Sequence, residues 1–555
     1  MANKLNHFFV NVGPDIANSI SQLNTTEDHL NDLIERNSNS MFLNPIKEKE
    51  ILDIVKNYEN KTSTDNMDID MKVVKQVIDG ILIPLKYIFN LSFQSGSFPN
   101  LMKIAKVIPL YKKTGNKHHF TNYRPISLLP QFSKILEKLF SSRMDTFIAK
   151  HNLLADNQYG FRANMSTSFA IIEAVEEITN ALESKQIAVG IFIDIKKAFD
   201  TVDHNLLLHK LEKYGFRGLV LKWIKSYLTN RRQYVQLGDV CSSEMNIISG
   251  VPQGSVLGPK LFILFINDLC SVSQAMKMVL FADDTNIFCS GENLNELLNL
   301  ATKEMKKIKA WFDCNNLAFN LDKTKIMVFG NNKNELIQFE INGVKVEVVH
   351  ENRFLGVIID DKMSWKPHIK QIQNKVSRSL AILNNVKHLL NYKSLHMLYC
   401  SLILPYFSYC AEIWGNNYIT SIKPLIVLQK RAIRVIHKAG YYDHTHPLFT
   451  HSKLLKLKDL VNYLTAQIMH KAQNKMLPNN IQKLFTSRDG GYSLRGQFRF
   501  KINITRTRRK QFCISFCGAR LWNNISDKIK NSPSIRLFKI QYRSKIFNDY
   551  IIINK

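Results

Sequence analysis

The spacing of hydrophobic positions divides the chain into a part that mixes helices with strands and a later part of helices alone. Apolar and acidic stretches alternate at helical spacing in residues 1–60, and a polar linker follows at 56–66. Continuous apolar runs then predict strands, namely AKVIPLY (105–111), IAVGIFIDI (187–195), MNIISGV (245–251) and KMVLFA (277–282). Amphipathic stretches between the runs, such as HNLLLHKLEKYGF and GLVLKWIKSYL, predict helices, so the fold class is α+β.

The strand pattern ends at about residue 365. From there, apolar residues recur three or four positions apart, which predicts a long helix through Ile369, Ile372, Val376, Leu380 and Leu383. More helices are expected through about residue 475. The chain therefore ends in a mostly helical region.

Two of the predicted strands end in carboxylates. Asp194 closes the run VGIFID, and Asp283 with Asp284 interrupts VLFADDTNIF, where strand, tight turn and strand predict a hairpin. Side by side, these strands would bring three carboxylates together, and such carboxylates repel unless a multivalent cation lies among them. Oxygen ligands without His or Cys favour Mg²⁺, and two ions about 3.5–4 Å apart serve nucleotidyl transfer. The alternative is ordinary turn chemistry, because Asp favours turns.

Charge and cysteine usage narrow the classes of function. The 555 residues include 75 Lys and Arg against 46 Asp and Glu, a net charge of +29, which fits a polyanionic partner such as nucleic acid. A merely basic protein is the alternative. The eight cysteines show no C-x-x-C pair, so neither a zinc site nor a disulfide framework is expected. No run reaches the ~18 apolar residues that span a bilayer, and the opening MANKLNHFFVNVG lacks signal-peptide features. We expect no membrane association and an intracellular location, in the nucleus, the cytoplasm or both.

Seven ordered segments together resemble the successive motifs of a reverse transcriptase. They are KVIPLYKKTGNKHHFTNYRPISLLPQFSKILEKL (106–139), QYGFR (158–162), FIDIKKAFDTVDH (192–204), SGVPQGSVLGPKLFILFINDL (249–269), FADDTNIF (281–288), NLAFNLDKTKIMVF (316–329) and NRFLGVIIDDKMSW (352–365). The resemblance covers roughly residues 60–370 and is to the enzymes of non-LTR retrotransposons, the transposable elements of the jockey and related LINE clades.

The resemblance implies a right-hand polymerase with fingers, a palm built on an antiparallel sheet and a helical thumb, plus a mostly helical basic C-terminal region. The expected parts are an N-terminal helical extension (1–60), fingers and palm (61–365), a helical thumb-like region (366–440) and the basic C-terminal region (441–555). NHFFVNVGPDIANSI resembles the segment between endonuclease and polymerase in such elements, so we expect a polymerase without its nuclease. The C-terminal region shows no RNase H carboxylates and no zinc knuckle.

Family roles can be carried over to individual positions. The resemblance implies that Asp194 and Asp283 hold two Mg²⁺ ions, which Mn²⁺ could replace, with Asp284 as a third metal-site carboxylate. The resemblance also implies that Lys323 assists the departure of pyrophosphate. The residues expected to bind the nucleotide are Lys112, Arg124, Phe199, Pro252, Gln253 and Gly254. Those expected to form the primer grip are Phe354, Leu355 and Gly356. Phe199 would exclude a 2′-hydroxyl. Each of these residues also has a plainer interpretation as surface charge, loop or core packing.

Departures from the family pattern are few. KTSTDNMDID lacks the glycines expected before the fingers, Lys196 replaces a small polar residue, and FADD replaces the commoner YADD. No metal ligand is lost. The basic stretch 492–516 interleaves Arg and Lys with Phe498, Phe500 and Phe512, which predicts either a nucleic-acid contact or a packed amphipathic segment.

The expected function is RNA-directed DNA polymerisation, in which an RNA template directs extension of a DNA primer or target with deoxynucleoside triphosphates, in the service of retrotransposition. Two alternatives stay open. One is a catalytically decayed or domesticated retrotransposon remnant that binds RNA. The other is a palm-type RNA polymerase, which the bulky Phe199 disfavours. The sequence does not identify a protein partner.

Overall fold

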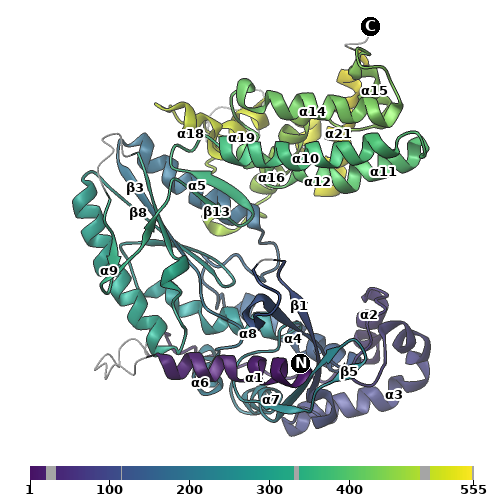
Figure 1. The fold of residues 1–555 in the computed structure, drawn as a ribbon, viewed down its shortest axis with the longest axis vertical. Helices are drawn as coiled ribbons and strands as arrows, with labels where there is room; N and C mark the ends of the chain where they lie inside the picture. The colour runs from purple at the N-terminus through teal and green to yellow at the C-terminus, as the bar shows by residue number, and fades with distance from the viewer. Residues whose placement is uncertain (21–32, 114, 331–336, 488–499, 553–555) are drawn as a thin grey trace.

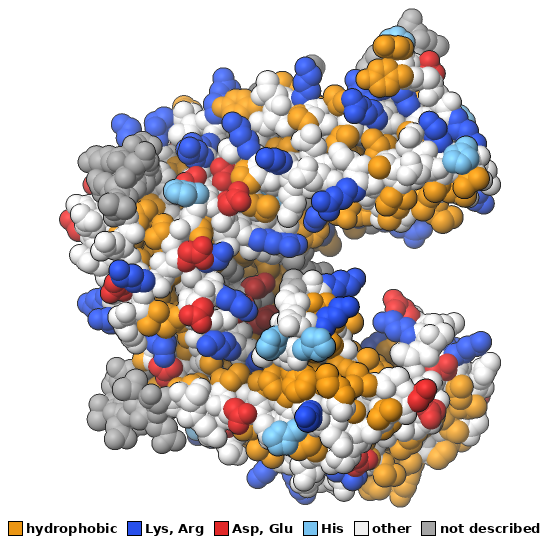
Figure 2. All heavy atoms as spheres, viewed as in Figure 1, with side chains coloured by type: hydrophobic (Ala, Val, Ile, Leu, Met, Phe, Trp, Pro, Cys, Tyr) orange, Lys and Arg blue, Asp and Glu red, His pale blue; other side chains and the backbone are white. Residues whose placement is uncertain are grey.

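The protein is a mixed α+β molecule whose two arms enclose a hollow (Figures 1 and 2). The structure is a computed structural model that describes residues 1–20, 33–113, 115–330, 337–487 and 500–552. The lower arm contains the N-terminus and a small sheet, a larger sheet lies at the closed side, and helices form the upper arm (Figure 1). None of the helices in the described part of the chain is long and apolar enough to cross a membrane.

The small sheet has the strand order β2-β1-β4-β5, with β6 paired to β4. Its β1 and β2 form an antiparallel hairpin, while β1 and β4 run parallel. The strands are β1 (Ile104–Tyr111), β2 (Tyr123–Leu128), β4 (Arg231–Leu237), β5 (Val240–Cys241) and β6 (Met245–Ile247). The helices around it are α1 (Ala2–Ser19), α2 (Glu48–Asn57), α3 (Met71–Ser95), α4 (Gln131–Lys150) and α7 (Leu219–Leu228).

The larger sheet has the order β12-β9-β3-β8-β7 and is antiparallel except for the β12–β9 pair. Its central strand β3 is covered on both faces, which explains its continuous apolar run. Val189 and Ile191 belong to the core that includes α9, whereas Ala188 and Phe192 belong to the core that includes α5. The strands are β3 (Ile187–Ile193), β7 (Lys277–Phe281), β8 (Asp284–Gly291), β9 (Lys325–Phe329) and β12 (Glu347–Val348). The helices near it are α5 (Thr167–Glu183), α6 (His204–Tyr214), α8 (Gly258–Phe265) and α9 (Leu294–Cys314).

Two short hairpins precede the helices of the upper arm. They are β10 (Glu340–Ile341) with β11 (Val344–Lys345), and β13 (Glu351–Phe354) with β14 (Val357–Asp360). The helical layer then consists of α10 (Lys366–Val386), α11 (Tyr392–Leu402), α12 (Leu404–Ser408), α13 (Ala411–Trp414) and α14 (Ile419–His437). The remaining helices are α15 (Thr445–Ser452), α16 (Leu457–Gln473), α17 (Asn479–Gln482), α18 (Arg508–Phe512), α19 (Ile514–Asn523), α20 (Asp527–Lys530) and α21 (Ile535–Ile552).

The strand predictions hold for the larger sheet and fail in part for the smaller one. The runs at 105–111, 187–195 and 277–282 form β1, β3 and β7. Of the run 245–251, only Met245–Ile247 is a strand, and it joins the small sheet by pairing with β4. The strand Arg231–Leu237 was not expected, since its polar residues hide the alternation. The proposed domain boundaries at 60, 365 and 440 stay predictions.

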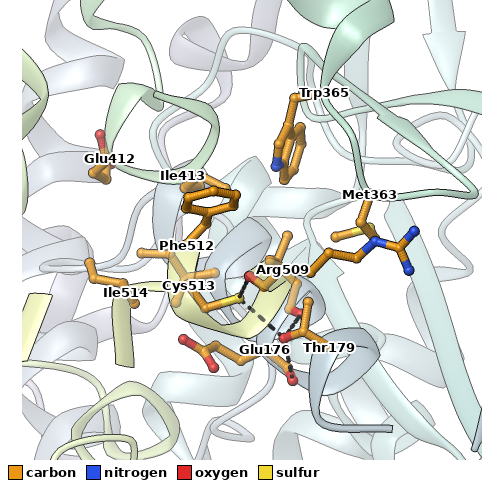
Figure 3. Close-up of a pocket in the computed structure, with 12 residues that line it drawn as sticks. Glu176, Thr179, Met363, Trp365, Glu412, Ile413, Arg509, Phe512, Cys513 and Ile514 are labelled. Carbon is orange, nitrogen blue, oxygen red and sulfur yellow. Dashed lines mark hydrogen bonds between the residues drawn. The ribbon is translucent and has the colours of Figure 1, made fainter. Parts of the chain in front are cut away.

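The chain returns near its end to pack on the larger sheet's helix α5. Glu183 accepts a hydrogen bond from the Thr507 backbone N–H (2.9 Å), and Glu176 forms an ion pair with Lys510. Figure 3 shows Thr179 and Glu176 facing the segment around Cys513, whose Sγ lies 3.2 Å from Thr179 Oγ1. Residues 506–515 therefore fasten the C-terminal helices to the larger sheet.

Candidate active site

A cleft of about 750 Å³ gathers residues from three parts of the fold. Its lining includes seven positions that the sequence singled out: Lys112, Arg124, Asp194, Phe199, Gln253, Asp283 and Lys323. They come from the β1–β2 hairpin, the end of β3, the loop before α8, the β7–β8 turn and the turn before β9. These residues lie up to 211 positions apart in the sequence, from Lys112 to Lys323, so only the tertiary fold brings them together.

Asp194 follows the last residue of β3 and is held by the turn before β9. Asn320 donates from Nδ2 to Asp194 Oδ2 (2.7 Å) and from its backbone N–H to the Asp194 carbonyl (3.0 Å). Lys323 Nζ lies 3.2 Å from the same carboxylate oxygen. Asp194 is thereby fixed in orientation while its charge is partly neutralised. The buried Asn320 was not predicted, although it stands inside the quoted segment NLAFNLDKTK.

Asp283 lies in the two-residue turn between β7 and β8, and Asp284 begins β8. Ala282 takes the left-handed conformation (φ +56°) that such a tight turn requires. The β3–β8 register pairs Ile193 with Thr285, so Asp194 and the two turn carboxylates lie at the same end of the sheet. The predicted hairpin is confirmed, with its carboxylates at the tip.

The segment QYGFR braces this turn from outside. Gln158 Oε1 accepts from the backbone N–H groups of Gly160 (2.8 Å) and Ala282 (3.2 Å), and Tyr159 N–H donates to the Leu280 carbonyl (2.8 Å). A Cβ on Gly160 would lie 2.3 Å from the Ala282 nitrogen. Glycine is therefore required for the close approach of the two backbones. The role of Gln158 as a buried support was missed.

The two carboxylates of the β7–β8 turn are perturbed by burial and by neighbouring negative charge. Reduced hydration by the surrounding protein raises the pKa of Asp283, and the charge of Asp194 raises it further. Reduced hydration, followed by repulsion from Asp283 and Asp194, raises the pKa of Asp284 to about 6. Hard oxygen donors in this arrangement fit Mg²⁺, because a divalent cation would relieve their repulsion. However, within the described ranges no three His, Cys, Asp or Glu side chains stand close enough to form a ready-made metal site.

Four cationic side chains, Lys112, Arg124, Lys197 and Lys323, lie close together in the lining of the cleft. Burial lowers the pKa of Lys112, as do the nearby charges of Lys197, Arg124 and Lys323. Burial likewise lowers the pKa of Lys197, which lines the cleft but was not predicted. Its signal was the second lysine of DIKKAFD. Mutual repulsion among cations is relieved by an anionic ligand, so this part of the lining is suited to phosphate groups.

Phe199 forms part of the floor beside Asp194. Its ring stacks on buried Phe262 (centroids 4.6 Å apart, planes at 30°) and meets Phe161 edge to face. The Phe199 carbonyl also accepts from the Val251 backbone N–H (2.8 Å). The ring is thus fixed by packing on one side and borders the cleft on the other. This position is compatible with contact to a ligand, and equally with core packing.

The Pro252-Gln253-Gly254 loop is held against the β2 strand. The Gln253 carbonyl accepts from Ser127 N–H (2.9 Å), while its side chain donates to Asp200 Oδ1 (2.8 Å). Gly254, at φ +114°, lies so close to Ser127 O that a Cβ would stand 2.7 Å away. Of the three loop residues, only Gln253 borders the cleft. Pro252 and Gly254 shape the loop instead.

One wall of the cleft is the N-terminal helix, which the sequence predicted only as an extension. Phe8, Val12 and Ile16 of α1 border the cleft, and the Lys197 ammonium lies 5.7 Å from the Phe8 ring centroid. Gly13 approaches the chain after β3 so closely that a Cβ would lie 2.1 Å from Asp200 O. Figure 1 shows α1 running along the lower arm, beneath the larger sheet. The helix is an integral part of the site.

Comparisons with known proteins agree with this arrangement. The family model described as "Reverse transcriptase (RNA-dependent DNA polymerase)" matches residues 111–359, the span that holds most of the cleft. The chain is 28% identical over 415 residues to the "Probable RNA-directed DNA polymerase from transposon BS" of Drosophila melanogaster (73% of this chain, 46% of the relative). It is 26% identical over 454 residues to the "RNA-directed DNA polymerase from mobile element jockey" of the same species (80% and 49%).

The chain is related to the reverse transcriptases. Its relatives are those of the jockey, X-element and BS non-LTR retrotransposons, as the sequence motifs predicted. The chain spans about half the length of these curated relatives. The similarity extends beyond the family match, because alignments over more than 400 residues must include part of the helical layer.

The residues predicted to form the primer grip lie at a hairpin outside the cleft lining. Leu355 (φ +45°) and Gly356 (φ +85°) form the two-residue turn between β13 and β14. Tyr409 of the helical layer donates from its hydroxyl to the Leu355 carbonyl (2.7 Å). Phe354 is buried and packs near Phe192. Of the three predicted residues, only Leu355 and Gly356 are therefore accessible to a ligand.

The aromatic residues of the basic stretch 492–516 also differ in how far they are buried. Phe500 is buried against Phe485, so the prediction that it stacks on bases is wrong. Phe512 is half-buried with its ring edge against Tyr418. Phe498 lies outside the described residues. For the described part of the stretch, the packed alternative is the better description.

Proposed function

We propose that the reverse transcriptase is an active RNA-directed DNA polymerase that extends a DNA 3′ end on an RNA template by two-metal nucleotidyl transfer, in the course of retrotransposition. The observation that carries the proposal is the cleft, whose lining combines Asp194 and Asp283 with the cations Lys112, Arg124 and Lys197. Carboxylates that can hold cations, beside cations that can hold phosphates, match the charge distribution of a metal-bound nucleoside triphosphate.

Asp194 and Asp283 would hold the ions, with Asp284 as the further carboxylate. Two Mg²⁺ ions supply activation of an attacking hydroxyl and stabilisation of the departing oxygen. In the reaction, the primer 3′ oxygen forms a bond to the α-phosphorus while the bond to the bridging oxygen breaks and pyrophosphate departs. Lys112 and Arg124 would orient the triphosphate, and Lys323 would shift from Asp194 toward the departing pyrophosphate. Pairing with the template base selects the nucleotide beside Gln253.

The choice of deoxynucleotides would rest on Phe199. Its ring is immobilised by Phe262 and borders the cleft five residues after Asp194. A fixed ring beneath the sugar leaves no space for a 2′-hydroxyl, so ribonucleotides are excluded by a clash rather than by a weaker contact.

The direct test is extension of a DNA primer on an RNA template with Mg²⁺ by the wild-type protein and by Asp283→Asn. We expect extension by the wild type only, with both proteins binding the primer–template equally. Mn²⁺ should support the wild-type reaction as well. Equal extension by the variant would contradict the assignment of the carboxylate.

A second function is favoured by one specific observation, the lack of a ready-made metal group among the described residues. A retrotransposon-derived protein that binds RNA without polymerising would have the same charge and the same fold. Such a protein would bind the RNA template with an affinity that falls as salt rises, yet it would extend no primer with either Mg²⁺ or Mn²⁺. The same assay therefore separates the two functions.

A further inference from the structure

The helical layer has an unusual charge pattern. Between Asp361 and Asp443 the chain contains twelve Lys and Arg residues and a single carboxylate, Glu412. Glu412 is buried, so it does not offset the surface charge. No other acidic side chain of this segment is available to pair with its cations, unlike in the cleft. Such a one-signed surface fits a polyanionic partner.

The cations gather around a groove between α10 and α14, which lie side by side in the upper arm (Figure 1). The groove has a volume of about 690 Å³. Its rim carries Lys387, Arg431, Arg434 and Lys438, and its floor is apolar, with Leu380, Leu428 and Val435. In Figure 2, blue side chains are spread over the arm that contains these helices.

The end of the groove offers aromatic surface. Tyr441 lines the groove and is 67% exposed, and Tyr442 beside it is 90% exposed. The nearest carboxylate at this end, Asp443, is turned back to accept from the Gly440 backbone N–H (2.7 Å), while Arg434 Nε donates to the Asp443 carbonyl. Large exposed rings next to cations form the usual platform for stacked bases.

We propose that this groove binds single-stranded nucleic acid as a site separate from the polymerase cleft. None of the groove-lining residues lines the cleft. The rim cations would contact phosphates, and the apolar floor with Tyr441 would contact bases. A duplex hides the faces of its bases, so the apolar floor favours a single strand. The proposal does not depend on catalysis, because binding of this kind would persist in an inactive protein.

The test uses the full chain and an unstructured fluorescent RNA of about 20 nucleotides without a primer. The triple variant Lys387→Gln, Arg431→Gln, Lys438→Gln removes three exposed charges. Affinity should fall at least tenfold, and the slope of log affinity against log salt should shrink by about 2, since each lost contact to a single strand contributes about 0.7. Tyr441→Ala should weaken binding by about fivefold or more without changing that slope.

The matched control removes the same charge elsewhere. Lys72→Gln, Lys303→Gln, Lys306→Gln changes three exposed lysines of α3 and α9, and RNA affinity should stay within about twofold of wild type. Single-stranded DNA of the same sequence, tested in parallel, shows whether the 2′-hydroxyl contributes. Equal loss in both triple variants would overturn the proposal, because only net charge would matter. Competition by polyglutamate as effective as by RNA would also overturn it, in favour of an acidic protein partner.

Discussion

The cleft and the helical layer are both basic, yet they use charge differently. In the cleft, Lys112 and Arg124 share the lining with Asp194 and Asp283, and neighbouring charges act on the pKa of Lys112 and of Asp283. In the helical layer, the segment between Asp361 and Asp443 holds a single carboxylate, the buried Glu412, to offset its twelve cations. Carboxylates and cations held close together in a cleft are costly to bury, and such perturbed groups are typical of sites that carry out chemistry. Unopposed surface charges are screened by salt and serve binding.

The largest expected effect comes from removing a cleft carboxylate. Asp194→Asn should reduce the rate of nucleotide incorporation about 10³-fold or more, because the proposed metal ligand and its transition-state stabilisation would be lost. Single-turnover primer extension measures this. RNA affinity should be unchanged, since the helical layer is intact. A variant that keeps more than a tenth of the wild-type rate would remove Asp194 from the metal site.

The next effect concerns Gly160, whose backbone supports the β7–β8 hairpin. Gly160→Ala places a Cβ 2.3 Å from the Ala282 nitrogen, so the turn that holds Asp283 must move. Misplacement by about 1 Å can cost about 10²-fold in rate, and we expect a loss of that order. The matched control is Gly80→Ala on α3, where nothing lies within 4 Å and stability should hold or rise. Equal activity of both variants would show that the hairpin tolerates displacement.

The sequence predicted the sheet that carries the carboxylates better than it predicted the surroundings of the site. The β3 run and the β7–β8 hairpin are local patterns, so periodicity and turn chemistry were sufficient to find them. The wall made by Phe8 and Val12, the brace by Gln158 and the clamp of Asn320 on Asp194 depend on contacts between distant segments. No local pattern marks such residues. The strand predicted over MNIISGV forms only at Met245–Ile247, and its partner strand β4 was not recognised in the sequence.

A smaller effect is expected at Phe199, the proposed steric barrier to ribonucleotides. Phe199→Val should raise the ratio of ribonucleotide to deoxynucleotide incorporation by about tenfold, equivalent to roughly 1.4 kcal/mol. The assay compares catalytic efficiencies with single nucleotides of each kind. Phe42→Val, at an exposed position outside the cleft lining, should leave the ratio unchanged. An unchanged ratio in an active Phe199→Val protein would make Phe199 a packing residue.

The smallest effect concerns the link between the two regions. Tyr409→Phe removes the hydrogen bond from the helical layer to the Leu355 carbonyl at the β13–β14 turn. Its loss should cost about 0.5–1.5 kcal/mol and raise the KM for primer–template by a few-fold, with kcat little changed. Steady-state extension at varied primer–template concentration measures both. A fall in kcat alone would mean that this turn acts on chemistry rather than on primer position.

We expect catalysis to reside in the cleft and the binding of single-stranded nucleic acid to reside in the helical layer. The most direct measurement determines both the extension rate at saturating primer–template and the affinity for primer-free RNA, in Asp194→Asn and in the triple variant of Lys387, Arg431 and Lys438. The Asp194→Asn protein should lose primer extension and keep its affinity for primer-free RNA. The triple variant should lose RNA affinity and keep the saturated extension rate. If either variant loses both properties while remaining folded, the two regions form one site and the account is wrong.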